Sequence, residues 1–527
     1  MSKSLVIPSA GYAKRIYPLS ANKPKVLIEL NGVPIFHLLY QKAVELKMDN
    51  IIIAINPEFE RQLKEFINFN YKNAEIPIYI EVVDNPSAGV LYSVYKATSS
   101  KHANEKILLM LSDTLYTDNL PVNEATDYSF MVYKEVKEQK RWCLIETDLG
   151  IVKKFWDKPQ GECPTYKALI GVYYFKKKGF NLACYKTFES ETKIANEYQL
   201  SQAFEEYLKD ETIYAIECGE DAWHDTGTLE NLRKASMNFF VSRSFNHIKI
   251  EDGYLIKESE NKKALRNQYM WFHNLNEKYL CPTIYGYEEG ETEKIKMELC
   301  SMPDLGTLFN FCQSEPVFFT QTIQYILKIL NKAWYQKQVS LSEAPNNNIK
   351  MLCDKTKNRF AETNYETPVG YYEMLNELLD ISLRPKYSKI HGDLILSNIL
   401  FDPQRMTIKL IDPRGEYGES SSYGDVRYDL AKMLHSLDGR YESIINNLFR
   451  IEYNEVIFYS NDEKDNCFKE ATKTLIKFAE SNGIPSRELY IIEASLFLSM
   501  LPLHASNMQQ QKAFYLTATR ILRSLYE

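Results

Sequence analysis

The sequence predicts an α/β protein of two domains. The first domain is expected to be a doubly wound sheet with helices on both faces, and the second an α+β domain with a small and a large lobe. The chain has 527 residues, more than one hydrophobic core usually serves. Apolar runs alternate with amphipathic runs over the first part of the chain, which is typical of parallel strands joined by helices. From Ile248 the pattern becomes a β-hairpin followed by long amphipathic segments, which indicates a second domain of another class.

Composition and charge exclude several classes of protein. The chain is 45% hydrophobic and 25% charged, as in soluble globular proteins. The formal net charge of −7 argues against a broad nucleic-acid surface. No run approaches the roughly 20 apolar residues of a membrane span, and the first residues do not look like a secretory signal. The nine cysteines form no Cys-x-x-Cys pair and fit reduced thiols. We therefore expect a cytoplasmic protein that binds small molecules and nucleotides, without nucleic acid or membrane insertion; a homo-oligomer is compatible with this.

The N-terminal half contains the alternating elements. The strands are expected at 4–8, 26–30, 50–56, 76–83 and 107–111, and the helices at 36–48, 61–69 and 229–240. In a parallel sheet, ligands bind beyond the carboxyl ends of the strands. The segments that follow these strands are therefore the first candidates for a site.

The first expected strand runs into a loop of small residues that includes Ala10 and Gly11. Backbone amides in such a loop can bind a triphosphate. Arg15 follows in the same loop, and Lys25 lies in Lys23-Pro24-Lys25. These two cations would stabilise the charge that builds on a transferring phosphorus.

Two aspartates follow later apolar runs. Asp113 comes directly after 107–111, and Asp225 lies in Trp223-His224-Asp225-Thr226-Gly227-Thr228. Each one alone is more typical of a turn or a helix cap. As a pair with Arg15 and Lys25 they predict a Mg²⁺ site, because two carboxylates with nucleotide phosphates satisfy this hard ion.

The run from Ser9 to Lys25 resembles the signature of sugar-1-phosphate nucleotidylyltransferases, Gly-x-Gly-x-Arg-x-x-Pro-Leu followed by Pro-Lys. The sequence departs from it at Ala13, where the second glycine usually stands. The resemblance covers about residues 1–235. It implies a Rossmann-like nucleotidyltransferase domain over 1–241, in which Asp113 and Asp225 bind Mg²⁺ and a nucleoside triphosphate (CTP, UTP or GTP) is a substrate.

The same resemblance implies further binding residues. Ala88 and Gly89, in Asn85-Pro86-Ser87-Ala88-Gly89-Val90, would lie near the nucleobase. Lys158 would contact the sugar phosphate or be a solvated charge, and Gly171 would line the sugar. Glu197 is expected to open a helix; it would contact substrate hydroxyls or serve only as an acid at the helix N-terminus.

The C-terminal half carries a second set of polar residues at Ile390–Gly415. Asp393 follows His391-Gly392, Asn398 comes five residues later, and Asp412 ends the apolar run Leu410-Ile411. Phosphoryl transfer needs a carboxylate that orients the attacking hydroxyl and oxygen ligands for magnesium. Asp393 suits the first role, and Asn398 and Asp412 suit the second.

This pattern resembles the aminoglycoside phosphotransferase and choline kinase family, which has the protein-kinase-like fold. The resemblance implies ATP and Mg²⁺ as partners of a domain over 242–527, with a small lobe at about 246–303 and a large lobe at about 304–527. Ser242–His247 is the expected junction.

Lys257, on the second strand of the hairpin 248–258, is placed like the small-lobe lysine that holds nucleotide phosphates. No glutamate stands where its usual helix partner would be, so Glu258, Glu260 and Gln268 stay open as its partner. Glu298 precedes an expected hinge at Gly306 that would bind adenine. Asp429 resembles the structural acid of the family.

Arg414 stands where choline kinases have an acidic and aromatic run, and could hold a phosphate or a carboxylate. Together the two halves predict a kinase that phosphorylates a sugar or sugar-like hydroxyl compound, and a nucleotidyltransferase that activates the product for surface polysaccharide synthesis. Three alternatives stay open: choline, ethanolamine or a polyol with CTP; a first domain that only senses sugar phosphates; and an antibiotic phosphotransferase.

Overall fold

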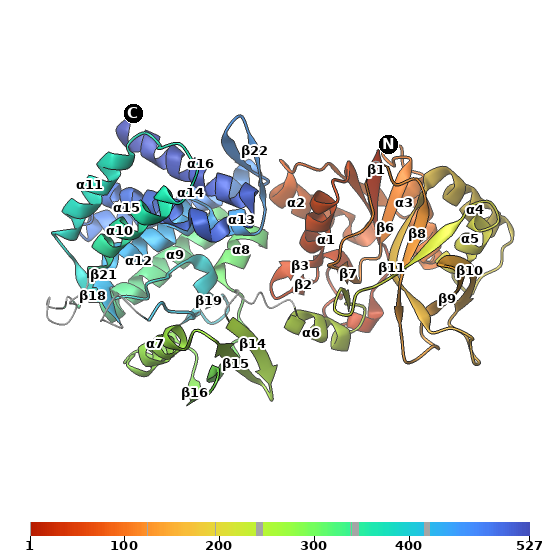
Figure 1. Ribbon diagram of the computed structural model, residues 1–527, viewed down its shortest axis with the longest axis horizontal. Helices are drawn as coiled ribbons and strands as arrows, with labels where there is room; N and C mark the ends of the chain where they lie inside the picture. Colours follow the sequence, from red (N-terminus) through yellow and green to blue (C-terminus); the bar gives the residue numbers. More distant parts are fainter. Residues whose placement is uncertain are drawn as a thin grey trace. The chain divides into compact units, whose positions relative to one another are not determined.

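The computed structural model describes residues 2–123, 125–194, 196–238, 246–337, 339, 347–415 and 422–527 (Figure 1). The chain forms two compact units. The first comprises Met1–Ile67 and Glu75–Phe239, and the second Asn68–Ala74 and Phe240–Glu527. The domain boundary expected between residues 241 and 242, and most of the expected junction, lie outside the described residues.

The centre of the first unit is a sheet for which nine strands are described. Its order is β5 (Ile78–Val82), β4 (Asn50–Ile55), β1 (Lys3–Ser9), β6 (Lys106–Met110), β11 (Lys167–Lys176), β8 (Ser129–Glu135), β12 (Ile213–Glu217), β10 (Ile151–Asp157) and β9 (Cys143–Asp148). The helices are α1 (Ile35–Glu45), α2 (Glu60–Tyr71), α3 (Val90–Thr98), α4 (Lys177–Glu189), α5 (Leu200–Tyr207) and α6 (Leu229–Asn238).

The parallel part of this sheet agrees with the sequence. β1 pairs in parallel with β4 and β6, and β4 with β5. Every residue of β1 and β4 is buried, as expected for strands that are covered on both faces. From β11 onward the sheet is mixed, because β11 pairs antiparallel with β6 and β8. No helix separates β8 to β11 along the chain, and a parallel connection normally needs one.

The strand expected at 26–30 is wrong in its first half. Lys25–Leu27 is a 3-10 turn, and β2 (Glu29–Leu30) pairs only with β3 (Val33–Pro34). Asn31 and Gly32 between them both have positive φ, 52° and 83°. An Asn-Gly pair favours a two-residue hairpin turn, so it joins β2 to β3. The first half of the expected strand is lost because the Leu27 N–H donates to the Pro24 carbonyl over 2.9 Å and the Ile28 N–H to the Lys25 carbonyl over 3.1 Å, which closes a turn.

The second unit begins with a four-stranded antiparallel sheet and one helix. The strand order is β14 (Asn246–Glu251), β15 (Tyr254–Ser259), β17 (Glu293–Glu298) and β16 (Ile284–Glu288). The hairpin expected at 248–258 is present as β14 and β15, joined by Asp252 and Gly253 at positive φ. Helix α7 (Lys262–His273) packs on the sheet through Leu265, which clusters with Ile295 and Met297 of β17.

The rest of the second unit is mostly helical (Figure 1). Its helices are α8 (Leu305–Phe311), α9 (Pro316–Leu330), α10 (Asn348–Ala361), α11 (Tyr371–Ser382), α12 (Val426–Leu437), α13 (Tyr441–Ile445), α14 (Asp462–Ser481), α15 (Ser486–Met500) and α16 (Met508–Tyr526). Three two-stranded antiparallel sheets are described beside them: β18 (Tyr387–Lys389) with β21 (Tyr423–Asp425), and the hairpins β19 (Ile399–Asp402) with β20 (Thr407–Leu410) and β22 (Phe449–Glu452) with β23 (Glu455–Phe458). Among the described helices, none combines the length and the apolar character that crossing a membrane requires.

Candidate active sites

The first candidate site is built where β7 (Thr114–Tyr116) pairs antiparallel with β13 (Trp223–Asp225). Asp225 lies opposite Thr114, and the Thr226 N–H donates to the carbonyl of Asp113 over 2.8 Å. Residues more than a hundred positions apart in the chain are therefore neighbours. The two carboxylates, predicted as a metal pair, are brought together by this strand pairing.

Gly227 marks the point where the charged groups converge. A Cβ atom at this glycine would lie 2.9 Å from Asp225 Oδ1, 3.1 Å from Asp113 Oδ2 and 3.6 Å from Arg15 Nη2. The Gly227 N–H donates to Asp225 Oδ1 over 2.7 Å, and Asn231 of α6 donates to the other oxygen. Only a residue without a side chain leaves this space open between the two carboxylates and the guanidinium.

Lys25 contacts the first of these carboxylates directly. Its Nζ lies 2.5 Å from Asp113 Oδ2. Burial by itself would raise the pKa of Asp113, but the charges of Lys25 and Arg15 outweigh it and hold the pKa below its ordinary value. Asp113 is therefore ionised at neutral pH, as a metal ligand must be.

A cavity of about 300 Å³ opens beside these groups. Five of the predicted residues line it: Arg15, Asp113, Lys158, Gly171 and Asp225. Gly171 has φ of 90°, and a Cβ there would lie 2.6 Å from Thr114 Oγ1. A larger residue at this position would strain the backbone and press on the strand that follows Asp113.

The cavity is also lined by residues that are not among the predicted site residues. Arg141 lies with its Nη2 atom 4.0 Å from Asp225 Oδ2 and its guanidinium over the Trp142 ring. Trp142 meets Trp223 edge to face at 5.4 Å. Asp157 accepts a hydrogen bond from Ser201 Oγ over 2.7 Å. Asp157 precedes Lys158 in the run Asp157-Lys158-Pro159, which carries the resemblance for that lysine and was therefore a signal for the aspartate as well.

In the loop after β1, Ala13 occupies the position where the resembled signature has its second glycine. Ala13 adopts the left-handed conformation, with φ of 48° and ψ of 40°. Glycine adopts this conformation without strain, which accounts for glycine in the resembled signature. Ala10 is buried, and its carbonyl accepts from Asn56 Nδ2 over 3.3 Å, whereas Gly11 is exposed with nothing within 4 Å of a Cβ.

Ala88 and Gly89 lie next to Glu197 and Tyr198. Gly89 has φ of 107°, and a Cβ there would lie 2.6 Å from the carbonyl oxygen of Tyr198 and 2.9 Å from Glu197 Cβ. The Tyr198 N–H donates to the Ala88 carbonyl over 2.8 Å. The expectation that Glu197 opens a helix is wrong. Glu197 forms an isolated bridge with Ile194, and α5 begins at Leu200 because Gln199 and Gln202 form its capping box.

The second candidate site lies around the β19–β20 hairpin. β19 starts directly after Asn398, and β20 ends two residues before Asp412. Ile399 lies opposite Leu410 in the strand pairing, so Asn398 and Asp412 are at the same end of the hairpin. The Ile411 N–H donates to the Asn398 carbonyl over 3.0 Å. Asn398 Nδ2 in turn donates to the carbonyl of Asp393 over 2.8 Å and lies 3.3 Å from its Oδ2. The three predicted residues are thus linked.

Lys257 contacts this group from the small sheet. Its Nζ lies 2.6 Å from Asp412 Oδ1 and 2.9 Å from Gln268 Oε1. Of the three partners that the sequence left open, the structure selects Gln268. The lysine is nearly fully buried at 2% exposure, so both contacts compensate for the water that its ammonium loses.

Buried groups hold the loop that carries Asp393. Asp429 accepts from the N–H groups of His391 and Gly392, over 2.8 and 2.7 Å. Burial raises the pKa of Asp429 to about 7 despite these donors, and lowers the pKa of His391 to about 4. The Asp393 carboxylate itself lies 3.0 Å from Lys432 Nζ of α12.

Arg414 and Glu298, the two remaining predicted residues, lie in different parts of the second unit: Arg414 near α12 and Glu298 in the small sheet. Arg414 follows Asp412, and its Nη1 donates to the Tyr428 hydroxyl over 3.0 Å. Glu298 accepts from the N–H and hydroxyl of Thr283, over 2.8 and 3.0 Å, and lies 3.4 Å from Lys409 Nζ. Its carboxylate is therefore engaged at the end of the inner strand β17 by Thr283 and Lys409, and not by Lys257, whose described contacts are Asp412 and Gln268.

The donor sets fit magnesium. In the described part of the chain no three Asp, Glu, His or Cys side chains group closely enough to hold a metal alone. Each site instead offers a pair of hard oxygen ligands, Asp113 with Asp225 and Asn398 with Asp412. Mg²⁺ commonly takes one or two carboxylates and completes its shell with water and substrate phosphates.

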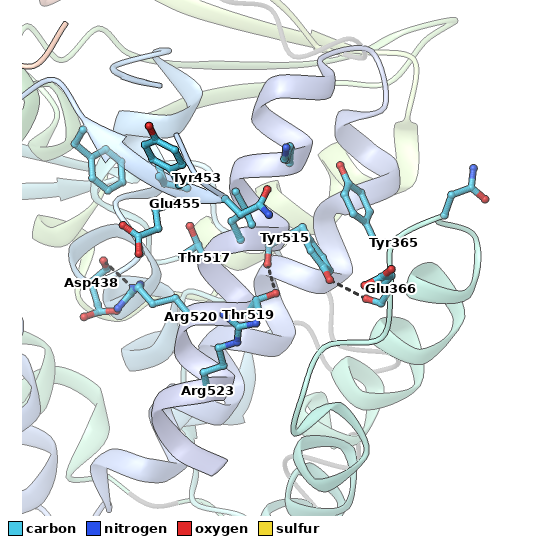
Figure 2. Close-up of a pocket in the computed structure, with 17 residues that line it drawn as sticks. Tyr365, Glu366, Asp438, Tyr453, Glu455, Tyr515, Thr517, Thr519, Arg520 and Arg523 are labelled. Atoms are coloured by element: carbon cyan, nitrogen blue, oxygen red, sulfur yellow. Dashed lines mark hydrogen bonds and ion pairs between the residues drawn. The ribbon is translucent and has the colours of Figure 1, made fainter. Parts of the chain in front are cut away.

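A second cavity, of about 920 Å³, lies elsewhere in the second unit. Figure 2 shows it between α16, the β22–β23 hairpin and the segment around Tyr365. Arg520 pairs there with Asp438 over 2.7 Å, and the rings of Tyr365 and Tyr515 stack at 4.5 Å. It contains none of the residues predicted from the motifs.

The fold and the site of the first unit define an α/β nucleotide-binding domain with a carboxylate pair at its strand ends. Residues 4–240 match the family described as Nucleotidyl transferase. The N-terminal unit is therefore a nucleotidyl transferase domain.

Several known proteins are similar to part of the chain. Bifunctional protein GlmU of Methanocaldococcus jannaschii is 26% identical over 261 residues, which is 48% of this chain and 58% of that protein. UTP–glucose-1-phosphate uridylyltransferase AglF of Haloferax volcanii is 26% identical over 240 residues, 44% of this chain and 93% of its own. A solved UDP-glucose pyrophosphorylase with UDP-glucose matches 46% of this chain and 99% of its own at 20% identity, with a TM-score of 0.39. The chain thus spans little more than half of the first relative.

Proposed function

We propose that the protein is a bifunctional enzyme. Its C-terminal unit phosphorylates a small hydroxylated compound, a sugar or a sugar-like molecule, with ATP. Its N-terminal unit transfers a nucleotidyl group from a nucleoside triphosphate to the phosphate so formed. The observation that carries the proposal is the convergence of Asp113, Asp225 and Arg15 on the space above Gly227, beside a cavity large enough for a substrate.

In the N-terminal reaction, an oxygen of the acceptor phosphate attacks the α-phosphorus, the bond to the β-phosphate breaks, and pyrophosphate leaves. Arg15 and Lys25 stabilise the negative charge on the phosphates during this step. Asp113 and Asp225 would hold Mg²⁺, which neutralises phosphate charge when bound. Lys158 and Arg141 are the cations of the cavity that would orient the acceptor phosphate. AglF, by its name, acts on glucose 1-phosphate, which supports a sugar phosphate as the acceptor.

In the C-terminal reaction, the acceptor hydroxyl attacks the γ-phosphorus, its proton passes to the Asp393 carboxylate, and ADP leaves. Lys257 would bind the nucleotide phosphates, and Asn398 and Asp412 would hold Mg²⁺. The linked contacts of Asp393, Asn398, Asp412 and Lys257 support this assignment. Placing both reactions in one chain suggests consecutive steps toward a nucleotide-activated sugar for surface polysaccharide synthesis.

A panel of substrates tests the proposal. The full-length protein is incubated with Mg²⁺, ATP and candidate hydroxyl compounds, and ADP formation is measured. In parallel, pyrophosphate release is measured with each of four nucleoside triphosphates and the corresponding phosphates. Acceptor-dependent ADP formation and phosphate-dependent pyrophosphate release are both expected. If pyrophosphate is never released, the first domain only senses sugar phosphates; if ADP never forms, the second unit is not a kinase.

A further inference from the structure

One face of α12 lies along the loop that carries Asp393. Asp429, Lys432 and Ser436 are three and four residues apart on this helix, a spacing that puts side chains on one face. Asp429 accepts from the backbone N–H groups of the two residues directly before Asp393. Ser436 Oγ accepts from the Leu396 N–H over 3.1 Å. Lys432 stands between these two, and its Nζ lies 3.0 Å from Asp393 Oδ1.

The contact of Lys432 differs from the other two because it holds a side chain and not the backbone. The two oxygens of the Asp393 carboxylate have different partners: Lys432 Nζ contacts Oδ1, and Asn398 Nδ2 donates to Oδ2 over 3.3 Å. The last side-chain bond of an aspartate has broad rotational preferences. One contact on each oxygen therefore fixes the plane of the carboxylate, and the Asn398 contact alone would leave that plane less restricted.

The stability of the fold does not account for this ion pair. The side chains of Lys432 and Asp393 are only 14% and 23% exposed. Taking two charges out of water costs about as much free energy as their attraction returns, so a buried pair stabilises a fold little. The pair does supply a defined orientation, because the lysine reaches the carboxylate from a helix whose neighbouring side chains hold the same loop.

We propose that Lys432 is a positioning residue for phosphoryl transfer in the C-terminal unit. It holds the Asp393 carboxylate at the angle at which this group accepts the proton of the acceptor hydroxyl. Lys432 itself neither gives nor takes a proton in the step. The inference rests on the proposed kinase function and adds to it a residue that lies outside the motif of Asp393, Asn398 and Asp412.

Variants of the full-length protein test this through the separation of kcat from KM. Lys432→Met keeps an unbranched side chain and removes the charge. It should lower kcat for ADP formation by about 10- to 100-fold, the cost of a misplaced catalytic group. KM for ATP should not change, because the nucleotide is assigned to Lys257 and the metal ligands. Pyrophosphate release by the N-terminal unit should also be unchanged.

Two further substitutions and a control accompany this variant. Lys432→Arg keeps a charged donor and should restore most of kcat. Lys432→Gln keeps a neutral donor and should lower kcat by about 2- to 10-fold, which provides a second test if Lys432→Met does not fold. Lys469→Met, at an exposed lysine of α14, should have no effect. A kcat of Lys432→Met equal to that of the wild type would overturn the inference.

A double-mutant cycle shows whether Lys432 acts through Asp393. Substitutions of residues in contact are not additive, so Lys432→Met should lower the residual kcat of Asp393→Asn by less than twofold. An equal loss in both backgrounds would mean that Lys432 only supports the fold, and would overturn the inference while the kinase function stands. A wild type that forms no ADP with any compound of the panel would instead overturn the kinase function, and the role of Lys432 with it.

Discussion

The two candidate sites resemble each other where the nucleotide would bind and differ where the acceptor would bind. In each site a lysine contacts one of the predicted metal carboxylates, Lys25 with Asp113 over 2.5 Å and Lys257 with Asp412 over 2.6 Å. The cavity of the first site is lined by aromatic, acidic and basic residues, among them Trp142, Asp157 and Lys158. In the second site, the residue proposed to meet the acceptor, Asp393, contacts Lys432.

The part of each site that would bind a nucleoside triphosphate is constrained by the charge of the phosphates. The part that would bind the acceptor is not constrained in this way. Any nucleoside triphosphate carries several negative charges, so both sites need cations and metal ligands in contact. The acceptors proposed for the two reactions differ, a phosphate in the first and a hydroxyl in the second, and the side chains around the two sites differ as well. If the two sites act independently, a variant in one site should change only one of the two activities, ADP formation or pyrophosphate release. A variant that changes both activities would contradict this.

The largest expected effect is that of Asp393→Asn. The change keeps the size of the side chain but removes the group that accepts the hydroxyl proton, so ADP formation should fall by about 10²- to 10⁴-fold. Pyrophosphate release from added phosphorylated acceptor should be unchanged. Both rates are measured on the same preparation, with Asp380→Asn, an exposed aspartate of α11, as the control. Loss of both activities would contradict two independent sites.

Asp113→Asn should have the reverse effect. Without this carboxylate, Lys25 and Arg15 lose their shared partner and the metal pair is incomplete, so pyrophosphate release should fall by about 10²- to 10³-fold, while ADP formation is retained. Asp148→Asn, an exposed position on β9, is the matched control. A variant that releases pyrophosphate at the normal rate would remove Asp113 from the site.

Gly89→Ala should weaken the first site through the backbone. The left-handed φ of 107° and the approach to the Tyr198 carbonyl leave no room for a Cβ, and such strain amounts to about 1–3 kcal/mol. The thermal unfolding temperature should fall, and KM for the nucleoside triphosphate should rise. Gly161→Ala, where nothing lies within 4 Å of a Cβ, should change neither. An unchanged KM would separate this loop from nucleotide binding.

The smallest effect is expected from Gln268→Ala. It removes one neutral partner of Lys257 and leaves the contact with Asp412, so KM for ATP should rise by about 2- to 10-fold, the range of one hydrogen bond. Gln268→Glu keeps an acceptor and should stay close to the wild type. A collapse of ADP formation in Gln268→Ala would show that the amide does more than orient the lysine.

Local patterns in the chain account for the elements that could be predicted. The Asp252-Gly253 turn between alternating strands predicts β14 and β15, and the hairpin is present. The spacing of Asp393 and Asn398 lies within one short segment, so the contact between them follows from the chain itself. The strand expected at 26–30 was wrong in its first half, because Lys25–Leu27 forms a 3-10 turn directly after Pro24.

The sequence could not predict contacts between distant segments. Lys432 reaches Asp393, and Arg141 reaches Asp225, only because the fold brings their elements together. Neither lysine nor arginine belongs to a motif, and a charged residue on a helix or a loop is usually solvated.

By itself, the sequence determined which residue types stand at the ends of the buried strands, and that a β-hairpin opens the second unit. Those features depend on neighbouring residues, whose periodicity and turn preferences act locally. Only the tertiary structure decided the mixed order of the large sheet, the meeting of Asp113 and Asp225 above Gly227, and the contact of Lys432 with Asp393. These depend on packing between segments far apart in the chain, and no local preference specifies which of them become neighbours.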